Sequence, residues 1–192
     1  MTTQRIFVMA LAALSLVLAV SLASVTDALA DPPGEWTYLV ATPGVGLCSD
    51  PPAPSCPAEA MAENGDIIQL FGFGMLTLGP KSADGGGLFT YFPSAGDSVD
   101  GTWVAKELLS FHSYGPSPVL PQIFEAGRAQ ILVELEEVAP GVGGLAILGV
   151  ECRLPEVKQP PATIEGIRLT VLDGLNFNEG IQPRATLFIR LD

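Results

Sequence analysis

The feature that most constrains the fold is the alternation of apolar and polar residues in the second half of the chain. Between residues 128 and 136 every odd-numbered residue is apolar, and most even-numbered ones are Arg, Gln or Glu. Segments 145–154, 167–171 and 184–191 alternate in the same way. Successive side chains of a β-strand point to opposite faces, so each segment predicts a strand with one buried and one solvated face.

Glycine and proline, which number 21 and 17 among 192 residues, cluster between the apolar segments. They separate four earlier extended segments, 35–41, 67–78, 88–92 and 102–114, and no segment has helical periodicity. About eight strands joined by short turns favour an all-β fold: a single eight-stranded antiparallel barrel, with a two-sheet β-sandwich as the alternative. A closed barrel leaves no strand edge exposed and can enclose a packed core or one small ligand.

Two glycines mark a special place in the segment 67–78. Gly72 and Gly74 lie on the same face of the expected strand. Glycine inside a strand predicts a bend or a close approach of other atoms to the backbone.

The first thirty residues have the order of a secretory signal peptide. Arg5 supplies a positive charge, residues 6–25 are uncharged and apolar, and Ala28-Leu29-Ala30 provides small residues at the cleavage site. We therefore predict cleavage after Ala30, an extracytoplasmic location, and no membrane insertion after cleavage. A retained membrane anchor is the alternative, because the apolar run is long enough to cross a bilayer.

The remaining chain has the length of one domain. Residues 31–192 are expected to fold as one unit, in which 31–65 form an N-terminal strand with a loop rich in cysteine and proline, and 66–192 form the main β-barrel domain. The net charge stays at −12, because the first thirty residues hold one arginine and one aspartate.

This acidity excludes some classes of partner. Nucleic acids and anionic membranes attract basic patches, and Lys and Arg are sparse here, so we expect neither as a partner. The sequence contains no calcium-loop motif, no short Cys-x-x-Cys zinc spacing and no nucleotide-binding glycine motif. We expect no metal and no cofactor.

Three cysteines in an oxidising compartment allow one internal disulfide and leave one thiol. We predict that Cys152 pairs with Cys48 or Cys56, because both upstream cysteines lie in a loop that could reach a neighbouring strand. A Cys48–Cys56 bridge would close a short loop that contains three prolines, which restrict its closure. Cys152 would then remain as a buried thiol.

Glu107 is the carboxylate whose surroundings are least usual. It shares the odd-numbered face of segment 102–114 with Trp103 and Phe111, so an inward face would bury it and make these three residues a ligand-binding set. The alternative is a bulge that turns Glu107 to solvent, because the even-numbered face is also apolar.

His112 is the only histidine, and it lies among serine and tyrosine hydroxyls beside Tyr114. Together with Glu107 these two residues are the only candidates for catalysis. No nucleophile-elbow motif accompanies them, and a lone histidine at a strand end is typical of a surface or hydrogen-bonded side chain.

Several short phrases occur across the expected domain: Met61-Ala62-Glu63-Asn64-Gly65-Asp66, Gly85-Gly86-Gly87-Leu88-Phe89-Thr90, Gly101-Thr102-Trp103, Leu108-Leu109-Ser110-Phe111-His112-Ser113-Tyr114-Gly115, Glu165-Gly166-Ile167-Arg168-Leu169 and Asn176-Phe177-Asn178-Glu179. In these phrases the chain resembles a group of small secreted microbial proteins of unassigned function, and the resemblance implies no activity, substrate or site. Gly101-Thr102-Trp103 also resembles the opening phrase of calycin-type ligand-binding barrels, although here it lies in mid-chain.

These observations favour a secreted, non-enzymatic binding or interaction module whose partner is a small apolar ligand or a protein surface. The first alternative is a small barrel isomerase or cyclase, in which Glu107 would be the buried acid and Tyr114 or His112 would assist. The second is a structural protein of the cell surface. An open interior lined by Trp103, Glu107 and Phe111 would favour the enzyme or a ligand carrier, and a filled interior would favour recognition at the surface.

Overall fold

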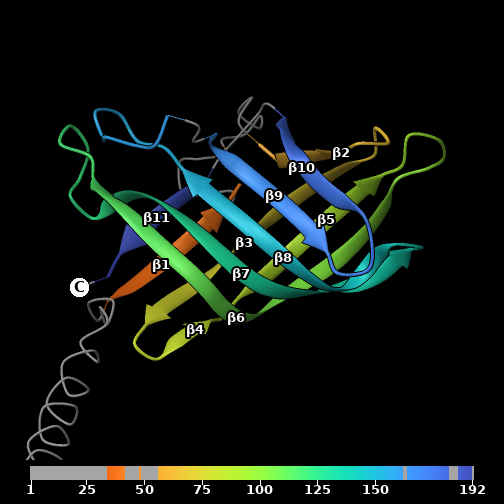
Figure 1. Ribbon diagram of the computed structural model, residues 1–192, viewed down its shortest axis with the longest axis horizontal. Helices are drawn as coiled ribbons and strands as arrows, with labels where there is room; N and C mark the ends of the chain where they lie inside the picture. The colour runs from red at the N-terminus through yellow and green to blue at the C-terminus, as the bar shows by residue number, and fades with distance from the viewer. Residues whose placement is uncertain (1–33, 42–47, 49–55, 162–163, 182–185, 192) are drawn as a thin grey trace, which may run out of the picture. The chain divides into compact units, whose positions relative to one another are not determined.

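The computed structural model describes residues 34–41, 48, 56–161, 164–181 and 186–191. These residues form eleven strands and no helix (Figure 1). The strands are β1 (Glu35–Val40), β2 (Ala58–Ala62), β3 (Ile67–Leu78), β4 (Lys81–Ala83), β5 (Gly86–Phe92), β6 (Val99–Pro116), β7 (Phe124–Ala139), β8 (Val142–Cys152), β9 (Gly166–Val171), β10 (Asn176–Ile181) and β11 (Thr186–Arg190). They belong to one compact unit, Pro33–Asp192. The predicted signal peptide lies outside the described residues.

The prediction of an all-β fold is confirmed, and every strand pairing is antiparallel. The pairings form one sheet, in which β7, β6, β5, β3, β2, β10, β9 and β8 make a closed ring. β1 and β11 form a second bridge between β3 and β7 (Figure 1). All eight predicted segments overlap strands, and β2, β4 and β10 are strands that the sequence analysis did not predict.

The long hairpin of β6 and β7 forms the most extensive pairing of the sheet. Its register shifts by one residue at three places, between Ala105 and Glu107, between Leu108 and Ser110, and again after Ser113. Each shift places an extra residue on β6, which is the signature of a β-bulge. The first bulge turns Glu107 to solvent, as the alternative interpretation of the sequence had it, and the second returns Phe111 to the core.

Aromatic side chains fill the interior by lying against glycines of other strands, either the next strand or the one beyond it. A Cβ atom added at Gly72 would overlap the Trp103 ring and the carbonyl oxygen of Gly86. A Cβ atom at Gly101 would similarly overlap the ring of Phe89. The close approach predicted for Gly72 is thus confirmed, and it creates the space that the largest core side chain occupies.

Hydrogen bonds keep the polar ends of these aromatic side chains satisfied inside the core. The indole Nε1 of Trp103 donates to the carbonyl oxygen of Phe71 at 3.0 Å, and the hydroxyl of Tyr38 donates to that of Asp84 at 2.9 Å. Burial raises the pKa of the Tyr38 hydroxyl well above its ordinary value, and the charge of Asp84 adds to this effect. Both residues are at most 1% exposed.

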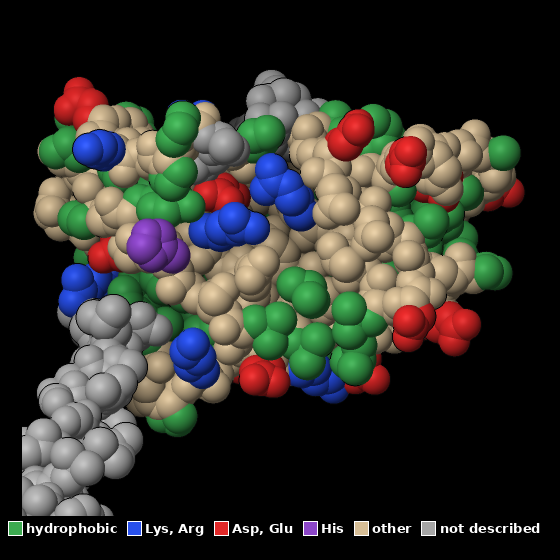
Figure 2. Space-filling view, in the orientation of Figure 1, with side chains coloured by type: hydrophobic (Ala, Val, Ile, Leu, Met, Phe, Trp, Pro, Cys, Tyr) green, Lys and Arg blue, Asp and Glu red, His purple; other side chains and the backbone are tan. Residues whose placement is uncertain are grey.

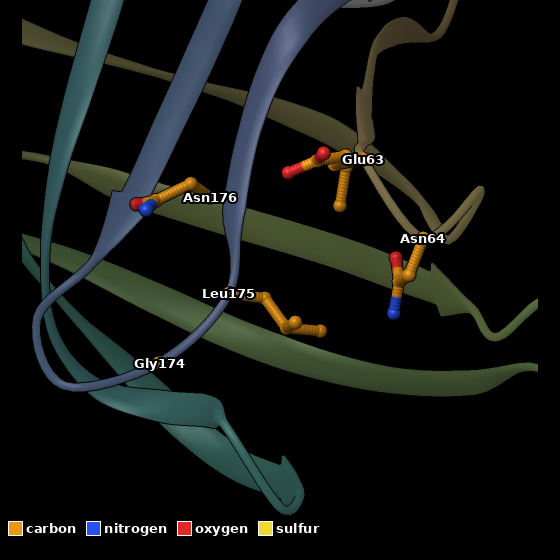
Figure 3. Close-up of a pocket in the computed structure, with 6 residues that line it drawn as sticks. Glu63, Asn64, Gly174, Leu175 and Asn176 are labelled. Atoms are coloured by element: carbon orange, nitrogen blue, oxygen red, sulfur yellow. The ribbon is translucent and has the colours of Figure 1, made fainter.

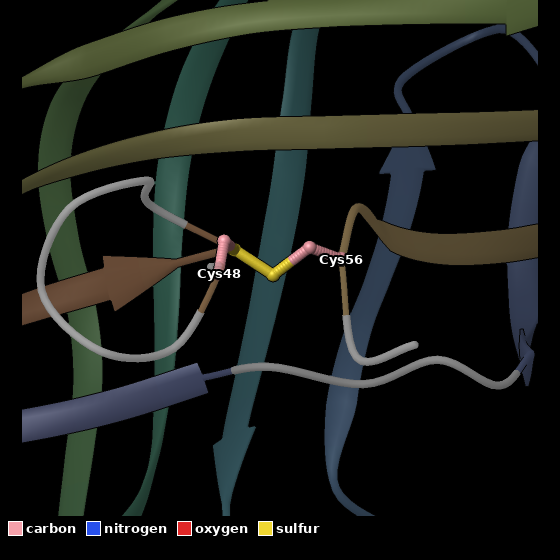
Figure 4. Close-up of a disulfide and its surroundings, with 2 residues drawn as sticks. All are labelled: Cys48 and Cys56. Atoms are coloured by element: carbon pink, nitrogen blue, oxygen red, sulfur yellow. A yellow bond between two sulfur atoms is a disulfide. The ribbon is translucent and has the colours of Figure 1, made fainter. Parts of the chain in front are cut away.

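The disulfide joins Cys48 to Cys56, whose Cα atoms are 5.7 Å apart (Figure 4). Cys152 is a free thiol with no exposed surface, so the prediction that it pairs with one of the other two is wrong. The physical reason is position: Cys152 points into the core from the end of β8, whereas the other two cysteines are close to each other. A disulfide indicates an oxidising, extracytoplasmic setting. The described residues contain no helix of the length and apolarity that a membrane span requires.

Substitution of Gly72 by Val tests the packing of the core. The new side chain would collide with the Trp103 ring and with backbone of β5, so we expect a loss of about 3 kcal/mol or more in the free energy of unfolding. Urea unfolding measures the change. Gly149→Ala is the matched control in another strand, because its added Cβ would make only ordinary contacts at 3.7 Å. Equal effects of the two substitutions would contradict this account of the core.

Thiol labelling tests the cysteine assignment. Burial raises the pKa of Cys152 to about 12, and the charge of Glu165 adds to this shift, so almost no thiolate exists at pH 8. We expect iodoacetamide to label one cysteine after unfolding and none before. Removing the bridge by replacing Cys48 and Cys56 with Ser should cost ~2–3 kcal/mol, as expected for a short loop. Non-reducing digestion before Asp50 separates the two bridged cysteines, and a linked peptide containing Cys152 would contradict the assignment.

Candidate functional site

The structure separates the three residues that the sequence placed in one ligand-binding set. Trp103 and Phe111 are buried, at 1% and 9% exposed, and Phe111 packs between Trp36 and Phe188 with ring centroids 4.8 and 5.0 Å away. Glu107 lies on the opposite, solvated face of β6. These residues therefore serve the core or the surface separately and do not line a common site.

His112 and Tyr114, in contrast, do lie together on the solvated face of β6. Their ring centroids are 5.4 Å apart, and the Tyr114 hydroxyl donates to Oε1 of Glu151 on β8 at 2.8 Å. Arg128 of β7 lies between His112 and Glu151 in the sheet, because it pairs with His112 of β6 on one side and with Glu151 of β8 on the other. The Nε of Arg128 lies 3.6 Å from Oε2 of Glu151.

Two buried carboxylates, those of Glu125 and Glu151, lie where the strand paired with β7 changes from β11 to β8. β7 pairs with β11 at Glu125 and with β8 from Gly127 onward. Oε2 of Glu125 accepts hydrogen bonds from Nε1 of Trp36 at 2.9 Å and from Oγ of Ser113 at 2.7 Å. Glu151 lies where β8 ends, and its carbonyl oxygen accepts a hydrogen bond from Thr186 of β11. These hydrogen-bonded partners offset the cost of burying a charge. Because the partners come from other strands, both residues also link strands that do not pair with each other.

Beside Glu151, the solvated face contains a hollow of about 100 Å³ that spans four strands. It is lined by Arg128, Gln130, Ile147, Gly149, Glu151, Arg168, Thr170 and Asn178. Figure 2 shows Lys and Arg side chains next to the single histidine on this face, which carries β7, β8 and β9 in Figure 1. We call this hollow the arginine hollow.

Gly149 and Arg168 determine the form of the arginine hollow. They are opposite each other on β8 and β9. Because Gly149 has no side chain, a space remains above it, and Arg168 lines this space. Arg168 is half-buried and has no hydrogen-bond or ion-pair partner among the described residues. Guanidinium groups bind carboxylate and phosphate groups through paired hydrogen bonds, so this site is suited to an anion.

A second, wider hollow of about 390 Å³ lies at one end of the sheet. Figure 3 shows Glu63 and Asn64, from the turn after β2, across from Leu175, which precedes β10; the side chain of Asn176, the first residue of β10, points away from them. The amide of Asn64 already donates to Asp66 at 2.9 Å, and Glu63 is the only charged residue of the lining. The hollow therefore offers few groups that could select a ligand.

Asp66 fixes the turn that borders this second hollow. It is 4% exposed, and its carboxylate accepts hydrogen bonds from the Tyr91 hydroxyl at 2.5 Å and from the backbone N–H of Ser94 at 2.7 Å. Burial favours a higher pKa for Asp66, but these bonds and that from Asn64 outweigh it and hold the pKa below its ordinary value. Burial and the same carboxylate raise the pKa of Tyr91 to about 12. The role of Asp66 is structural.

Comparison with protein-family models, curated proteins and solved structures finds no match to this chain. The site is therefore defined by its own geometry. The described residues contain no group of three or more His, Cys, Asp or Glu side chains placed to hold a metal ion.

The sequence predicts His112 and Tyr114 as candidates but does not indicate the residues that surround them. Alternation predicts that Glu151 lies on a solvated strand face, and it assigns no role to Arg128 or Arg168. The available signal was the occurrence of Arg or Gln on the polar faces of all four alternating segments, in a chain with only nine Lys and Arg residues. Which of these residues meet depends on the strand register, and alternation alone does not fix it.

Substitution of Asp66 by Asn tests its structural role through pH. A carboxylate with a lowered folded pKa stabilises the fold above the pKa of the unfolded chain, about 4, and this contribution is lost as the pH falls through the folded value. We expect urea unfolding free energies of the wild type to fall on acidification below pH 5 more steeply than those of Asp66→Asn. The control is Asp97→Asn, which changes an exposed carboxylate in the next turn. An identical acid dependence of wild type and Asp66→Asn would refute the role.

Proposed function

We propose that this protein is an extracytoplasmic binding module that recognises a small ligand on the solvated face of β7–β10, at the arginine hollow. The observation that carries the proposal is the contrast between the two faces of the sheet. The inward face holds close-packed aromatic rings, whereas the outward face gathers two arginines and several amide and hydroxyl groups around a hollow. A ligand site of this kind needs a concave surface and a few convergent polar groups.

In this proposal the ring of paired strands is a single antiparallel barrel, and the chain is secreted after its first thirty residues are removed. The closed path of pairings through eight strands supports the barrel. The Cys48–Cys56 bridge supports export to an oxidising compartment. The charged, apolar and small-residue order of the N-terminus supports the signal peptide.

The packing around Trp103 and Phe111 favours surface recognition over an internal site for an apolar ligand. An isomerase or cyclase that uses Glu107 as a buried acid is a weaker candidate, because Glu107 is exposed and lies apart from the two aromatic residues. A purely structural role at the cell surface would give no reason for a half-buried arginine, beside a hollow, that has no hydrogen-bond or ion-pair partner in the described part of the chain.

Nuclear magnetic resonance of the purified ¹⁵N-labelled protein tests the proposal. The probe is the small-molecule fraction of the producing culture, with palmitate as an apolar control. We expect the amide signals of Gln130, Gly149 and Thr170 to move, while the indole signal of Trp103 stays in place. Movement of the Trp103 signal would favour an internal site, and conversion of a component of the fraction would favour an enzyme. If no signal moves, the proposed small-molecule binding is wrong.

A further inference from the structure

We propose that the arginine hollow is a site for one small oxyanion group, a carboxylate or a phosphate, held between Arg128 and Arg168. This inference rests on the proposed function and deepens it by naming the chemistry of the ligand. The two arginines come from β7 and β9, and β8 runs between them with Gly149 and Glu151 on the floor.

The site is open above Gly149, where an anion would lie, and is occupied by a side chain at Glu151. Gly149 pairs with Gln130 on one side and with Arg168 on the other, so the missing side chain leaves a gap between two long polar ones. Two residues further along β8, Glu151 is held by Tyr114 and Arg128 and is almost fully buried. An anion therefore fits over Gly149, on the side of the arginines away from the carboxylate.

The electrostatics of the site are unusual for this chain. The lining holds two arginines and one glutamate, which leaves a local charge of +1 in a protein of net charge −12. Arg128 contacts Glu151 through its Nε, at 3.6 Å, and so keeps its terminal nitrogens for another partner. Arg168 has no partner among the described residues. Two guanidinium groups that share a hollow repel each other, and an anion between them would remove this repulsion.

Neutral donors complete the lining. Oγ of Ser110 donates to Oε1 of Gln130 at 3.1 Å, which leaves the amide NH₂ of Gln130 as the group available to a ligand. The hydroxyl of Thr170 and the amide of Asn178 lie on the same lining. The volume of about 100 Å³ is small, with room for a few water molecules. This size suits one ionised group and leaves the rest of a larger ligand on the open face.

The test is a titration of the purified ¹⁵N-labelled protein with sodium phosphate and, separately, with sodium acetate, at ionic strength held constant with sodium chloride. We expect saturable shifts of the Gly149 and Arg168 amide signals with at least one of the two anions. The two titrations distinguish a tetrahedral phosphate from a planar carboxylate as the preferred group. Shifts with neither anion beyond those caused by chloride would overturn the inference.

Three variants separate a built site from general attraction of anions. Arg168→Gln should weaken the binding by about tenfold or more, as expected for the loss of a charge-assisted hydrogen bond. Arg153→Gln is the matched control, since it makes the same change of charge at an exposed arginine that bonds to Gln159 and does not line the hollow. Gly149→Leu keeps both charges but fills the gap, and it should also abolish saturable binding. Equal effects of the Arg168 and Arg153 substitutions would show nonspecific attraction and would overturn the inference.

The outcomes also keep this inference distinct from the proposed function. If culture components move the signals of the arginine hollow while phosphate and acetate do not, the site binds a ligand of other chemistry, and only the oxyanion inference fails. If those components move the Trp103 indole signal instead, the proposed surface site itself is wrong.

Discussion

The packing of large aromatic rings against glycines of other strands is the constraint on which the rest of the structure depends. Trp103 occupies the space that the absence of a side chain at Gly72 leaves, and Phe89 does the same at Gly101. Each pair makes the interior dense without moving the strands apart, and dense packing is what gives a core one well-defined arrangement. Because aromatic rings occupy the interior in this way, the packing supports the proposal that a ligand binds on the solvated face of the sheet.

The sheet also needs links between strands at the place where β7 changes from pairing with β11 to pairing with β8. The strands β8 and β11 follow one another along one edge of β7 and do not pair with each other there. Of the five polar residues that are buried in the described part of the chain, four lie at or near this junction: Ser117, Glu125, Glu151 and Thr186. Their hydrogen bonds supply the links that a continuous ladder would have supplied. Glu151 thus has two effects: its carbonyl oxygen links β8 to β11, and its carboxylate holds Tyr114 and also Arg128, which lines the arginine hollow.

The sequence predicted the fold class and the inward faces of β7, β8 and β9 well, because regular alternation over a full strand leaves little choice of face. It failed where a strand is irregular or buried on both sides. In β11 the alternation placed Leu187 and Ile189 together on the apolar face, yet Phe188 is fully buried and packs against Phe111. In β6 the bulges change which residues point inward, and Glu107 and Leu108 exchange the faces that strict alternation would give them. The disulfide was missed because the sequence does not show that Cys48 and Cys56 lie close enough to bridge, with Cα atoms 5.7 Å apart.

The candidate site could be predicted only in part, and the reason is general for sites on sheets. His112 and Tyr114 attract notice because their side chains are chemically distinctive, but Arg128 and Arg168 become neighbours of one hollow only through the registers of two strand pairs. A one-residue slip in either pair would move an arginine to the other face. The buried polar junction at Glu125 and Glu151 opposes such a slip, because the slip would leave a carboxylate without its partners in the interior. The hydrogen bonds of Glu125 and Glu151, which link the strands at this junction, therefore also set the positions of the arginines on the surface of the sheet.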